Sequence, residues 1–268
     1  MNINSKVNLH TGRKMPVLGL GTWELTDQTA DTIAKALLLG YPMIDTSGDY
    51  GTQPGIGEGI KKSRVPRDQF YLVTKVEETD DAYGATLKDL QELQLDYADL
   101  MLIHRPPEQG VGQKLWEGLI RAKQDGLTKD IGVSNYSAKQ IDELIKATDV
   151  VPVVNQIEWS PFGHSMEMLD YCADKGIIVQ AYSPLTRSER LDDSELREIA
   201  SKYEKSPAQI LTRWNLQIGT VPIVKANKIE HMKEDLNIFD FELDEEDMET
   251  LNSMNEQYSA LGSTLQYV

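Results

Sequence analysis

Residues 70–75 read FYLVTK, residues 99–104 read DLMLIH and residues 130–135 read DIGVSN. Each is a short run of β-branched or apolar residues, which is typical of a buried strand. The residues between these runs carry amphipathic helical patterns, as Leu115 and Leu119 illustrate. Strands that alternate with helices in this way predict parallel strands joined by crossover helices.

The same alternation continues along the whole chain. Consecutive strand centres lie 24 to 43 residues apart, which leaves room for a strand, a loop and a helix each time. Eight candidate strands are centred near Gly19, Ile44, Leu72, Met101, Ile131, Asn155, Val179 and Pro222. Because such units close through right-handed crossovers, we predict an α/β protein with a (β/α)8 TIM barrel, as one domain over residues 1–268.

A doubly wound open sheet is the alternative fold, and dinucleotide-binding glycines would favour it. The two glycine-rich segments do not complete that motif. Glu24 stands where a third glycine should follow Gly19-Leu20-Gly21, and Ile60 stands there after Gly55-Ile56-Gly57. We therefore prefer the barrel.

Both ends of the chain add elements to the barrel. Val7–Leu9 and Met15–Val17 flank a turn, which predicts an N-terminal β-hairpin that closes the bottom of the barrel. One extra helix is predicted over about 194–203, and another begins at Ser206-Pro207, where Ser suits the N-cap and Pro the first helical position. The acidic run Asp244–Asp247 suits the start of a further C-terminal helix.

The charge and composition exclude several classes of partner. A net charge of −16 over 268 residues repels phosphate backbones and anionic lipids, so we expect no nucleic-acid and no membrane partner. Met1–His10 contains no apolar signal segment, and no run reaches the roughly 18 apolar residues of a membrane span. The lone cysteine, Cys172, cannot form an internal disulfide. We expect a cytoplasmic monomer that binds no metal.

Polar residues follow the ends of the predicted strands. The carboxyl ends of barrel strands meet at one rim, where barrel enzymes carry their chemistry. Each polar residue taken alone has an ordinary explanation, such as a cap, a salt bridge or a core histidine. Seven strands that end in this way predict a site, formed by Asp45, Lys75, His104, Ser134, Asn135, Gln156, Tyr182 and Lys225.

Three of these residues make chemical sense once Tyr50 is added. A tyrosine hydroxyl has a pKa of about 10 and donates its proton poorly at neutral pH unless a nearby cation stabilises the phenolate. Lys75 can be that cation, Asp45 can balance its charge, and His104 can orient a carbonyl group. Such a group of side chains needs a source of hydride, and a nicotinamide cofactor is the simplest one.

The ordered motifs resemble those of the aldo-keto reductases, with particular likeness to prokaryotic diketogluconate-reductase-like members. They extend from about residue 6 to about residue 256. The matching segments are MPVLGLGTW at 15–23, Asp45 with Tyr50-Gly51, Thr74-Lys75, LIHRP at 102–106, IGVSNY at 131–136, Asn155-Gln156 and AYSPL at 181–185. The resemblance implies NAD(P)H-dependent reduction of small aldehydes or ketones, with Tyr50 as proton donor and Asp45, Lys75 and His104 as its catalytic partners.

The resemblance also implies a set of cofactor contacts. Ser134, Asn135 and Gln156 would hold the nicotinamide amide, and Tyr182 would stack on its ring. Ser183 and Leu185 would contact the pyrophosphate. The remaining implied cofactor contacts are Thr22, Trp23, Lys225, Ala226, Asn227, His231 and Asp235. Trp23 would also line the substrate slot with Tyr50 and His104.

The chain departs from the family pattern in the cofactor site. His231 and Asp235 stand where members have an Arg and an Asn around the adenosine 2′-phosphate and adenine. A largely neutral histidine binds phosphate less strongly than arginine does. Lys225 and Lys228 still supply positive charge. We therefore expect NADP(H) with a weakened preference, and we keep NAD(H) as the alternative.

The chain also departs from the pattern near the substrate. Ser47-Gly48-Asp49 replaces the alanine-containing segment common before the catalytic tyrosine. Glu77 and Arg105 occupy positions where tryptophans are often found, so we expect a more polar pocket mouth. Arg105 either attracts a substrate carboxylate or pairs with a neighbour such as Glu77 or Glu108. The short tail after residue 256 predicts a reduced specificity loop and broad carbonyl substrates.

Two other functions stay open on the sequence. One is a Schiff-base lyase that uses Lys75 or Lys225 as its nucleophile. The other is a nicotinamide-binding sensor or assembly subunit with little turnover.

Overall fold

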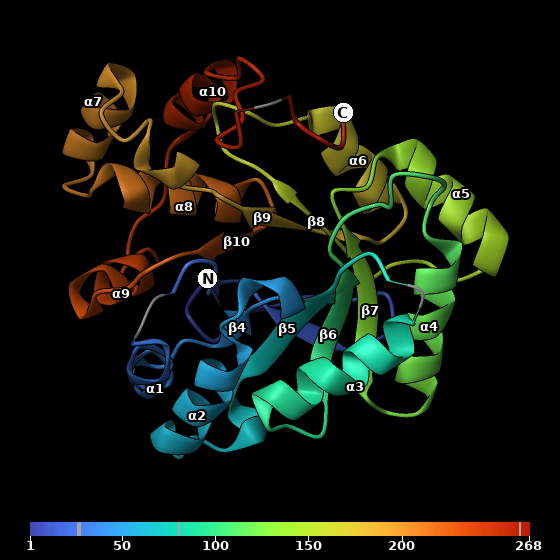
Figure 1. Cartoon of the computed structure of the whole chain (residues 1–268). Coiled ribbons are helices and arrows are strands. Elements are labelled where there is room, and N and C mark those ends of the chain that lie inside the picture. Colours follow the sequence, from blue (N-terminus) through green and yellow to red (C-terminus); the bar gives the residue numbers. More distant parts are fainter. Residues whose placement is uncertain (26–27, 80, 263) are drawn as a thin grey trace.

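The computed structural model describes residues 1–268 except 26, 27, 80 and 263. The parallel strands are β3 (Gly19–Gly21), β4 (Met43–Asp45), β5 (Tyr71–Val76), β6 (Ala98–Ile103), β7 (Thr128–Ser134), β8 (Val154–Glu158), β9 (Ile178–Tyr182) and β10 (Val221–Val224). Within the described residues these eight strands close into a barrel in the order β10-β3-β4-β5-β6-β7-β8-β9 (Figure 1). Each strand contains its predicted centre, and the predicted barrel is confirmed.

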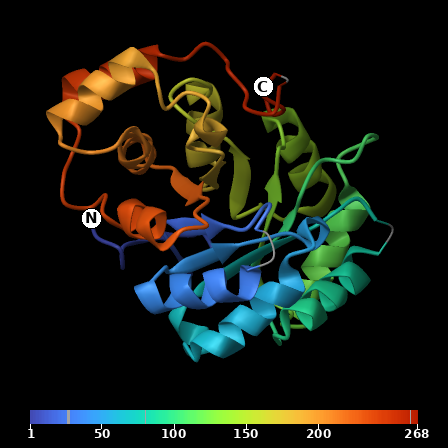
Figure 2. The ribbon, with the colours of Figure 1, turned by 60° about the vertical axis from the view of Figure 1, so that its left-hand side comes forward.

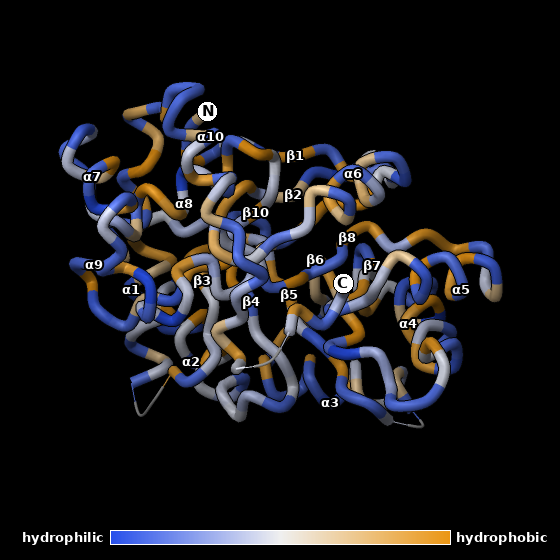
Figure 3. The backbone as a smooth tube through the Cα atoms, turned by 90° about the horizontal axis from the view of Figure 1, so that it is seen from above, coloured by the Kyte–Doolittle hydropathy of each residue, from blue (hydrophilic) through white to orange (hydrophobic). Residues whose placement is uncertain are grey.

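Helices follow the strands and surround the barrel (Figure 3). The helices that connect successive strands are α1 (Thr29–Leu39), α2 (Gln53–Ser63), α3 (Ala82–Leu93), α4 (Gln113–Gln124), α5 (Ala138–Thr148), α6 (Met166–Asp174) and α8 (Pro207–Gln217). Short 3-10 turns are η1 (Gly48–Tyr50), η2 (Arg67–Gln69) and η3 (Thr186–Ser188). The predicted additional helices are present as α7 (Ser194–Lys202) and α10 (Glu245–Ser253), and α8 begins at the predicted Pro207. The structure adds α9 (Ile229–Leu236), which was not predicted.

The predicted helix starts are explained by their caps. The Ser206 hydroxyl accepts a hydrogen bond from the backbone N–H of Gln209, whose side chain bonds back to Ser206 and completes a capping box. The Asp244 carboxylate accepts a 3.0 Å hydrogen bond from the backbone N–H of Asp247. The acidic run is therefore a helix start, as predicted.

Alternate residues along each strand face two different apolar cores. On β5, Leu72 packs against the helices, whereas Val73 packs inside the barrel. Met43 and Leu102 share this inner core with Val73. Because side chains alternate along a strand, the residue two positions later lies on the same side. Asp45, Lys75 and His104 follow Met43, Val73 and Leu102 by two positions, so they lie one layer closer to the carboxyl-terminal mouth.

The N-terminal hairpin closes the other end of the barrel. Its antiparallel strands are β1 (Lys6–Asn8) and β2 (Lys14–Pro16). Leu9 and Met15 belong to the inner core, together with Val153 and Val221 near the amino ends of β8 and β10. This arrangement confirms the predicted hairpin and leaves the carboxyl-terminal mouth as the open end.

The glycines of β3 serve packing inside the barrel. A Cβ atom on Gly19 would lie 2.7 Å from Cδ1 of Ile223 and 2.9 Å from Cε of Met43. A larger residue would displace these core side chains. The glycine-rich segment of β3 is therefore part of the barrel wall, in agreement with the rejection of an open dinucleotide-binding sheet.

The barrel closes between its first and last strands. β10 pairs with β3, and α9 packs against α1, so the last barrel strand and the helix after it lie beside the first barrel strand and the first helix (Figure 2). Cys172 is fully buried, as expected of a lone cysteine that serves the core. Within the described part of the chain, no helix has the length and apolar character needed to cross a membrane.

Candidate active site

A cavity of about 650 Å³ opens at the carboxyl-terminal mouth of the barrel. Most of the residues that the sequence assigned to catalysis, cofactor or substrate line this cavity. They are Thr22, Trp23, Asp45, Tyr50, His104, Arg105, Asn135, Gln156, Tyr182, Ser183, Leu185, Lys225, Asn227 and His231. The structure therefore brings together residues that are separated by up to about two hundred positions in the chain.

The other predicted residues lie behind this lining. Lys75 is fully buried beneath Tyr50, and Ser134 and Ala226 are buried as well. Glu77 turns toward His104. Asp235 differs from the expectation that it faces the cofactor. It is 4 % exposed, does not line the cavity and accepts a 3.2 Å hydrogen bond from the Tyr41 hydroxyl.

A buried ion pair forms the floor of the cavity. The Lys75 ammonium donates hydrogen bonds of 2.7 Å to Asp45 Oδ1 and 2.8 Å to the Thr46 carbonyl. Lys75 is fully buried and Asp45 is 3 % exposed. A buried charge of this kind is tolerated only when it is paired and hydrogen-bonded. The pair therefore holds a positive charge at a fixed place in the barrel.

Tyr50 lies above this charge. Lys75 Nζ is 5.3 Å from the centroid of the Tyr50 ring. Burial raises the pKa of Tyr50 above its ordinary value near 10, while the positive charge of Lys75 opposes the increase. Lys75 thus lowers the pKa of Tyr50 as predicted, but burial raises this pKa by more. Tyr50 therefore carries its proton at neutral pH.

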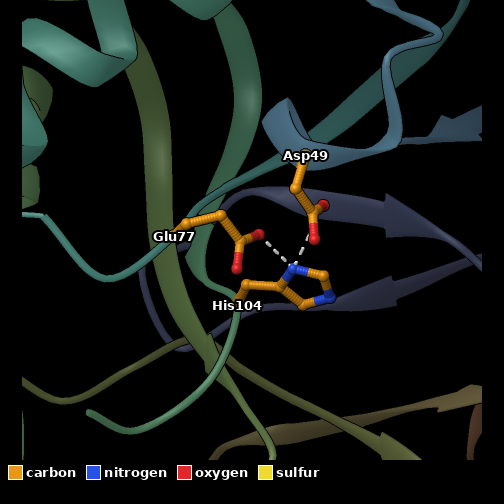
Figure 4. A group of neighbouring side chains, drawn as sticks. All are labelled: Asp49, Glu77 and His104. Carbon is orange, nitrogen blue, oxygen red and sulfur yellow. Dashed lines mark hydrogen bonds and ion pairs between the residues drawn. The ribbon is translucent and has the colours of Figure 1, made fainter.

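His104 stands beside Tyr50 and is surrounded by oxygen atoms. The two rings meet edge to face, with centroids 5.7 Å apart. The His104 Nδ1 atom contacts Oε1 of Glu77 directly and lies 3.5 Å from Asp49 Oδ1 (Figure 4). It also lies 3.2 Å from the Ser47 hydroxyl. Glu77 thus engages His104, and no ion pair between Glu77 and Arg105 is present in the described part of the chain.

The predicted nicotinamide contacts form one hydrogen-bonded network. The Tyr182 hydroxyl donates a 2.8 Å bond to Asn135 Oδ1, and Asn135 Nδ2 donates to the His104 carbonyl. Gln156 Nε2 donates 2.7 Å and 3.0 Å bonds to Asp45 and Gln180. Asn135 and Gln156 line the cavity next to the tyrosine ring, so the donors and acceptors suit a carboxamide that stacks on an aromatic face.

The opposite end of the cavity is basic, although the chain is strongly acidic. The cations Arg187, Lys225 and Lys228 line it together with His231 and with Glu24, whose carboxylate lies 3.6 Å from the Lys225 ammonium. Trp23 lies between two of these cations, with the Arg187 guanidinium 4.2 Å and the Lys225 ammonium 5.3 Å from its ring centroid. A concave surface with several cations suits the phosphate groups of a dinucleotide. The residues present therefore fit a nicotinamide dinucleotide.

Sequence reasoning missed Arg187 because its position depends on an unusual loop. Ser183, Thr186, Arg187 and Ser188 all have left-handed backbone angles, with φ between 49° and 70°. Such angles cost non-glycine residues on the order of 1 kcal/mol or more each and are frequent at ligand-binding segments. No local pattern in the sequence predicts four of them within six residues.

The short C-terminal tail reaches the cavity. Leu261 and Gln266 are among its lining residues. The tail is anchored on β8, because Ser259 Oγ and the Ala260 N–H each donate a 2.7 Å hydrogen bond to the Glu158 carboxylate. The tail after residue 256 therefore contributes to the wall of the cavity, and the reduced specificity loop stays a prediction.

Comparisons with known proteins agree with this geometry. The model of the aldo/keto reductase family matches residues 17–256. The glyoxal reductase of Bacillus subtilis is 39 % identical over 260 residues, which cover 95 % of this chain and 94 % of the relative. The crystal structure of an aldo/keto reductase from Brucella melitensis has 36 % identity and a TM-score of 0.88, covering 93 % of this chain and 99 % of that one.

A further solved relative carries a cofactor. The aldo-keto reductase of Bombyx mori in complex with NADP has 31 % identity and a TM-score of 0.88, with 96 % of this chain and 94 % of that chain covered. The family match extends over nearly the whole barrel and includes the segments that build the cavity, apart from the C-terminal tail. The chain therefore belongs to the aldo/keto reductase family of NAD(P)H-dependent oxidoreductases.

Proposed function

We propose that the protein reduces small aldehydes or ketones to alcohols with NAD(P)H, and that Tyr50 donates the proton. The observation that carries this proposal is the buried Lys75–Asp45 ion pair directly beneath Tyr50, with His104 beside the tyrosine at the floor of the cavity. A phenol above a fixed positive charge is suited to donate a proton to a carbonyl oxygen.

Each member of the group has a distinct role in the proposed reaction. The hydride for the carbonyl carbon would come from NAD(P)H held in the cavity. The Tyr50 hydroxyl donates a hydrogen bond and then its proton to the carbonyl oxygen, and the phenolate that forms is stabilised by Lys75. Asp45 keeps Lys75 in place, because its carboxylate accepts from both Lys75 and Gln156. His104 holds the substrate carbonyl from the other side.

The proposed cofactor contacts lie in two regions of the cavity. Asn135, Gln156 and Tyr182 would hold the nicotinamide end, and Ser183 and Leu185 would lie along the pyrophosphate. Arg187, Lys225, Lys228 and His231 would face the phosphates at the other end. NADP(H) is favoured because several cations gather there and because the Bombyx mori relative is solved with NADP. NAD(H) stays the alternative, since His231 replaces an arginine.

One kinetic experiment tests the proposed function. A panel of about twenty carbonyl compounds, including glyoxal because of the Bacillus subtilis relative, is offered with NADPH and with NADH. We expect carbonyl-dependent loss of NADPH absorbance. Tight NADPH binding without turnover over the whole panel would instead indicate a sensor or assembly subunit.

Borohydride trapping tests the lyase alternative. A Schiff-base lysine must be neutral and free to attack. Lys75 is fully buried and bonded to Asp45 and Thr46, which disfavours this chemistry. We expect no substrate to be trapped on Lys75 or Lys225.

We also propose that residues 1–268 work as one domain and as a monomer in the cytoplasm. The single closed barrel in the described residues and the buried, unpaired Cys172 support this proposal. Light scattering of the purified protein measures its mass directly, and a mass of about 60 kDa, twice the 30.2 kDa of one chain, would contradict the monomer.

A further inference from the structure

Three departures from the family pattern meet at one atom. Ser47 and Asp49 belong to the segment before Tyr50, and Glu77 follows β5 almost thirty residues later. All three reach Nδ1 of His104. The Ser47 hydroxyl also lies 3.1 Å from Glu77 Oε1, so it joins the carboxylate to the ring. This group (Ser47, Asp49, Glu77 and His104) is the carboxylate–histidine cluster.

The orientation of the ring defines its protonation pattern. Nδ1 points toward Glu77 and Asp49, and the second ring nitrogen, Nε2, points away from both (Figure 4). An ionised carboxylate only accepts hydrogen bonds, so Nδ1 must carry a proton to bond with it. A neutral ring would then have no proton on Nε2. Only the positively charged imidazolium can bond to Glu77 and also donate from Nε2.

Negatively charged side chains lie close to the ring. Two carboxylates face His104, whose side chain is 8 % exposed, while those of Asp49 and Glu77 are each 34 % exposed. The other titratable or charged side chains near it are Tyr50 on η1, Asp45 and Lys75 on the strands below, Arg105 next in the chain, Tyr182 on β9 and Asp89 on α3. Lys75 is neutralised by Asp45. The negative charges of Asp49 and Glu77 therefore dominate at the ring.

Asp89 adds little to this balance. It lies near η1, where one of its oxygens accepts a 2.9 Å hydrogen bond from Gln53. Burial raises the pKa of Asp89 to about 6. It is therefore incompletely ionised in mildly acidic solution, and it does not touch the His104 ring.

We propose that Glu77, assisted by Asp49 and Ser47, is a positioning residue that keeps His104 as an imidazolium with its Nε2–H directed to the substrate carbonyl oxygen. This inference rests on the proposed carbonyl reductase function. Tyr50 remains the proton donor, and His104 retains its proton throughout. A hydrogen bond from a charged donor is roughly twice as strong as a neutral one, and it stabilises the negative charge that develops on the oxygen.

The first test reads the ring directly and needs no substrate. The chain has four histidines, so the ¹⁵N signals of the imidazole rings are few, and His104→Gln identifies the signal of His104. At pH 7 we expect both ring nitrogens of His104 to carry protons. In Glu77→Gln the loss of the ring proton should move to lower pH by about one unit or more, since one carboxylate is removed. A neutral His104 ring at pH 7 in the unmodified protein would overturn the inference.

The second test follows the reaction. In the unmodified enzyme, kcat for reduction should fall as His104 loses its proton at alkaline pH. In Glu77→Gln this decline should begin about one pH unit lower, with the KM for NADPH unchanged. Glu77→Asp should restore most of the original profile, because the carboxylate is retained.

Glu78→Gln is the matched control. Glu78 is exposed, directly follows Glu77 and loses the same charge on substitution. Its pH profile should match that of the unmodified enzyme. Identical profiles for Glu77→Gln and Glu78→Gln in an active enzyme would refute the role of Glu77 alone. An enzyme that reduces no carbonyl compound would refute the proposed function, while the NMR result would still decide the state of His104.

Discussion

Gln156 on β8 donates a 2.7 Å hydrogen bond to Asp45 on β4, although these strands lie on opposite sides of the barrel. The other oxygen of Asp45 accepts from Lys75, also at 2.7 Å. Both oxygens of the carboxylate are therefore held, one by a neutral amide and one by the buried ammonium. This arrangement fixes Lys75 beneath Tyr50 and links the proposed proton donor to the nicotinamide side of the cavity.

Removal of Lys75 should destabilise the barrel. In Lys75→Met, the Asp45 carboxylate stays buried and keeps Gln156 but loses its counter-charge. Breaking a buried ion pair in this way costs about 3–5 kcal/mol of unfolding free energy. Urea unfolding at neutral pH measures the loss.

The double variant separates charge from packing. In Lys75→Met with Asp45→Asn no uncompensated charge remains, so we expect it to be more stable than Lys75→Met alone. If the decrease in unfolding free energy in the double variant equals the sum of the decreases in Lys75→Met and Asp45→Asn, the ion pair does not act as a unit.

Tyr50→Phe should remove the proton donor and leave the cavity otherwise intact. We expect kcat to fall by roughly 10² to 10⁴, the usual effect of losing a general acid. The dissociation constant of NADPH, measured by fluorescence titration, should not change. Tyr97→Phe is a suitable control, because Tyr97 precedes β6 and stacks with Arg67 away from the cavity. Near-normal turnover of Tyr50→Phe would assign the acid role to another group.

His231→Arg should increase the preference for NADPH over NADH. His231 lines the basic end of the cavity, and arginine adds a permanent charge with a bidentate geometry for phosphate. A charged hydrogen bond contributes about 1.5–3 kcal/mol, so the ratio of the two affinities should rise at least about tenfold. Lys233→Arg, at another exposed position of α9, controls for an added arginine. An unchanged ratio would show that His231 does not face the phosphate.

The barrel and most of its mouth could be predicted because both depend on local patterns. The run at 70–75 contains Leu72 for the outer core, Val73 for the inner core and Lys75 for the mouth, and this alternation is visible in the sequence. Once the strands are placed, the closed topology brings their carboxyl ends together whatever the distance along the chain.

The remaining features depend on how separate segments meet. Glu77 and Asp49 were visible in the sequence, but only the pairing of β4 with β5 and of β5 with β6 places both of them at His104. Arg187 depends on a series of left-handed backbone angles. Asp235 was assigned to the cofactor by its position in the motif, yet the Tyr41 hydroxyl from the end of α1 binds it in the core. These are tertiary contacts, which no spacing within one segment encodes.

Asp235 should make the stability of the protein fall as pH rises. Burial raises the pKa of this carboxyl from its ordinary value of 3.8 to about 7, although the Tyr41 hydrogen bond acts in the opposite direction. Between these values the folded protein holds a proton that the unfolded chain has released. The contribution to stability is therefore complete below about pH 4 and is lost as pH rises to about 7.

Asp235→Asn isolates this effect because asparagine cannot ionise and can still accept from Tyr41. We expect the variant to exceed the unmodified protein in unfolding free energy at pH 8, by an amount on the order of 1 kcal/mol or more, since one pKa unit corresponds to about 1.4 kcal/mol. The advantage should shrink toward pH 4, where Asp235 is protonated in both states. Urea unfolding at several pH values measures the difference in unfolding free energy between the two proteins. Burial also raises the pKa of Asp89, but Asp89 is present in both proteins, so its contribution cancels in this difference. Parallel stability curves for the two proteins would mean that Asp235 is ionised in the folded state, and its carboxylate would then need a cationic partner in place of the Tyr41 hydroxyl.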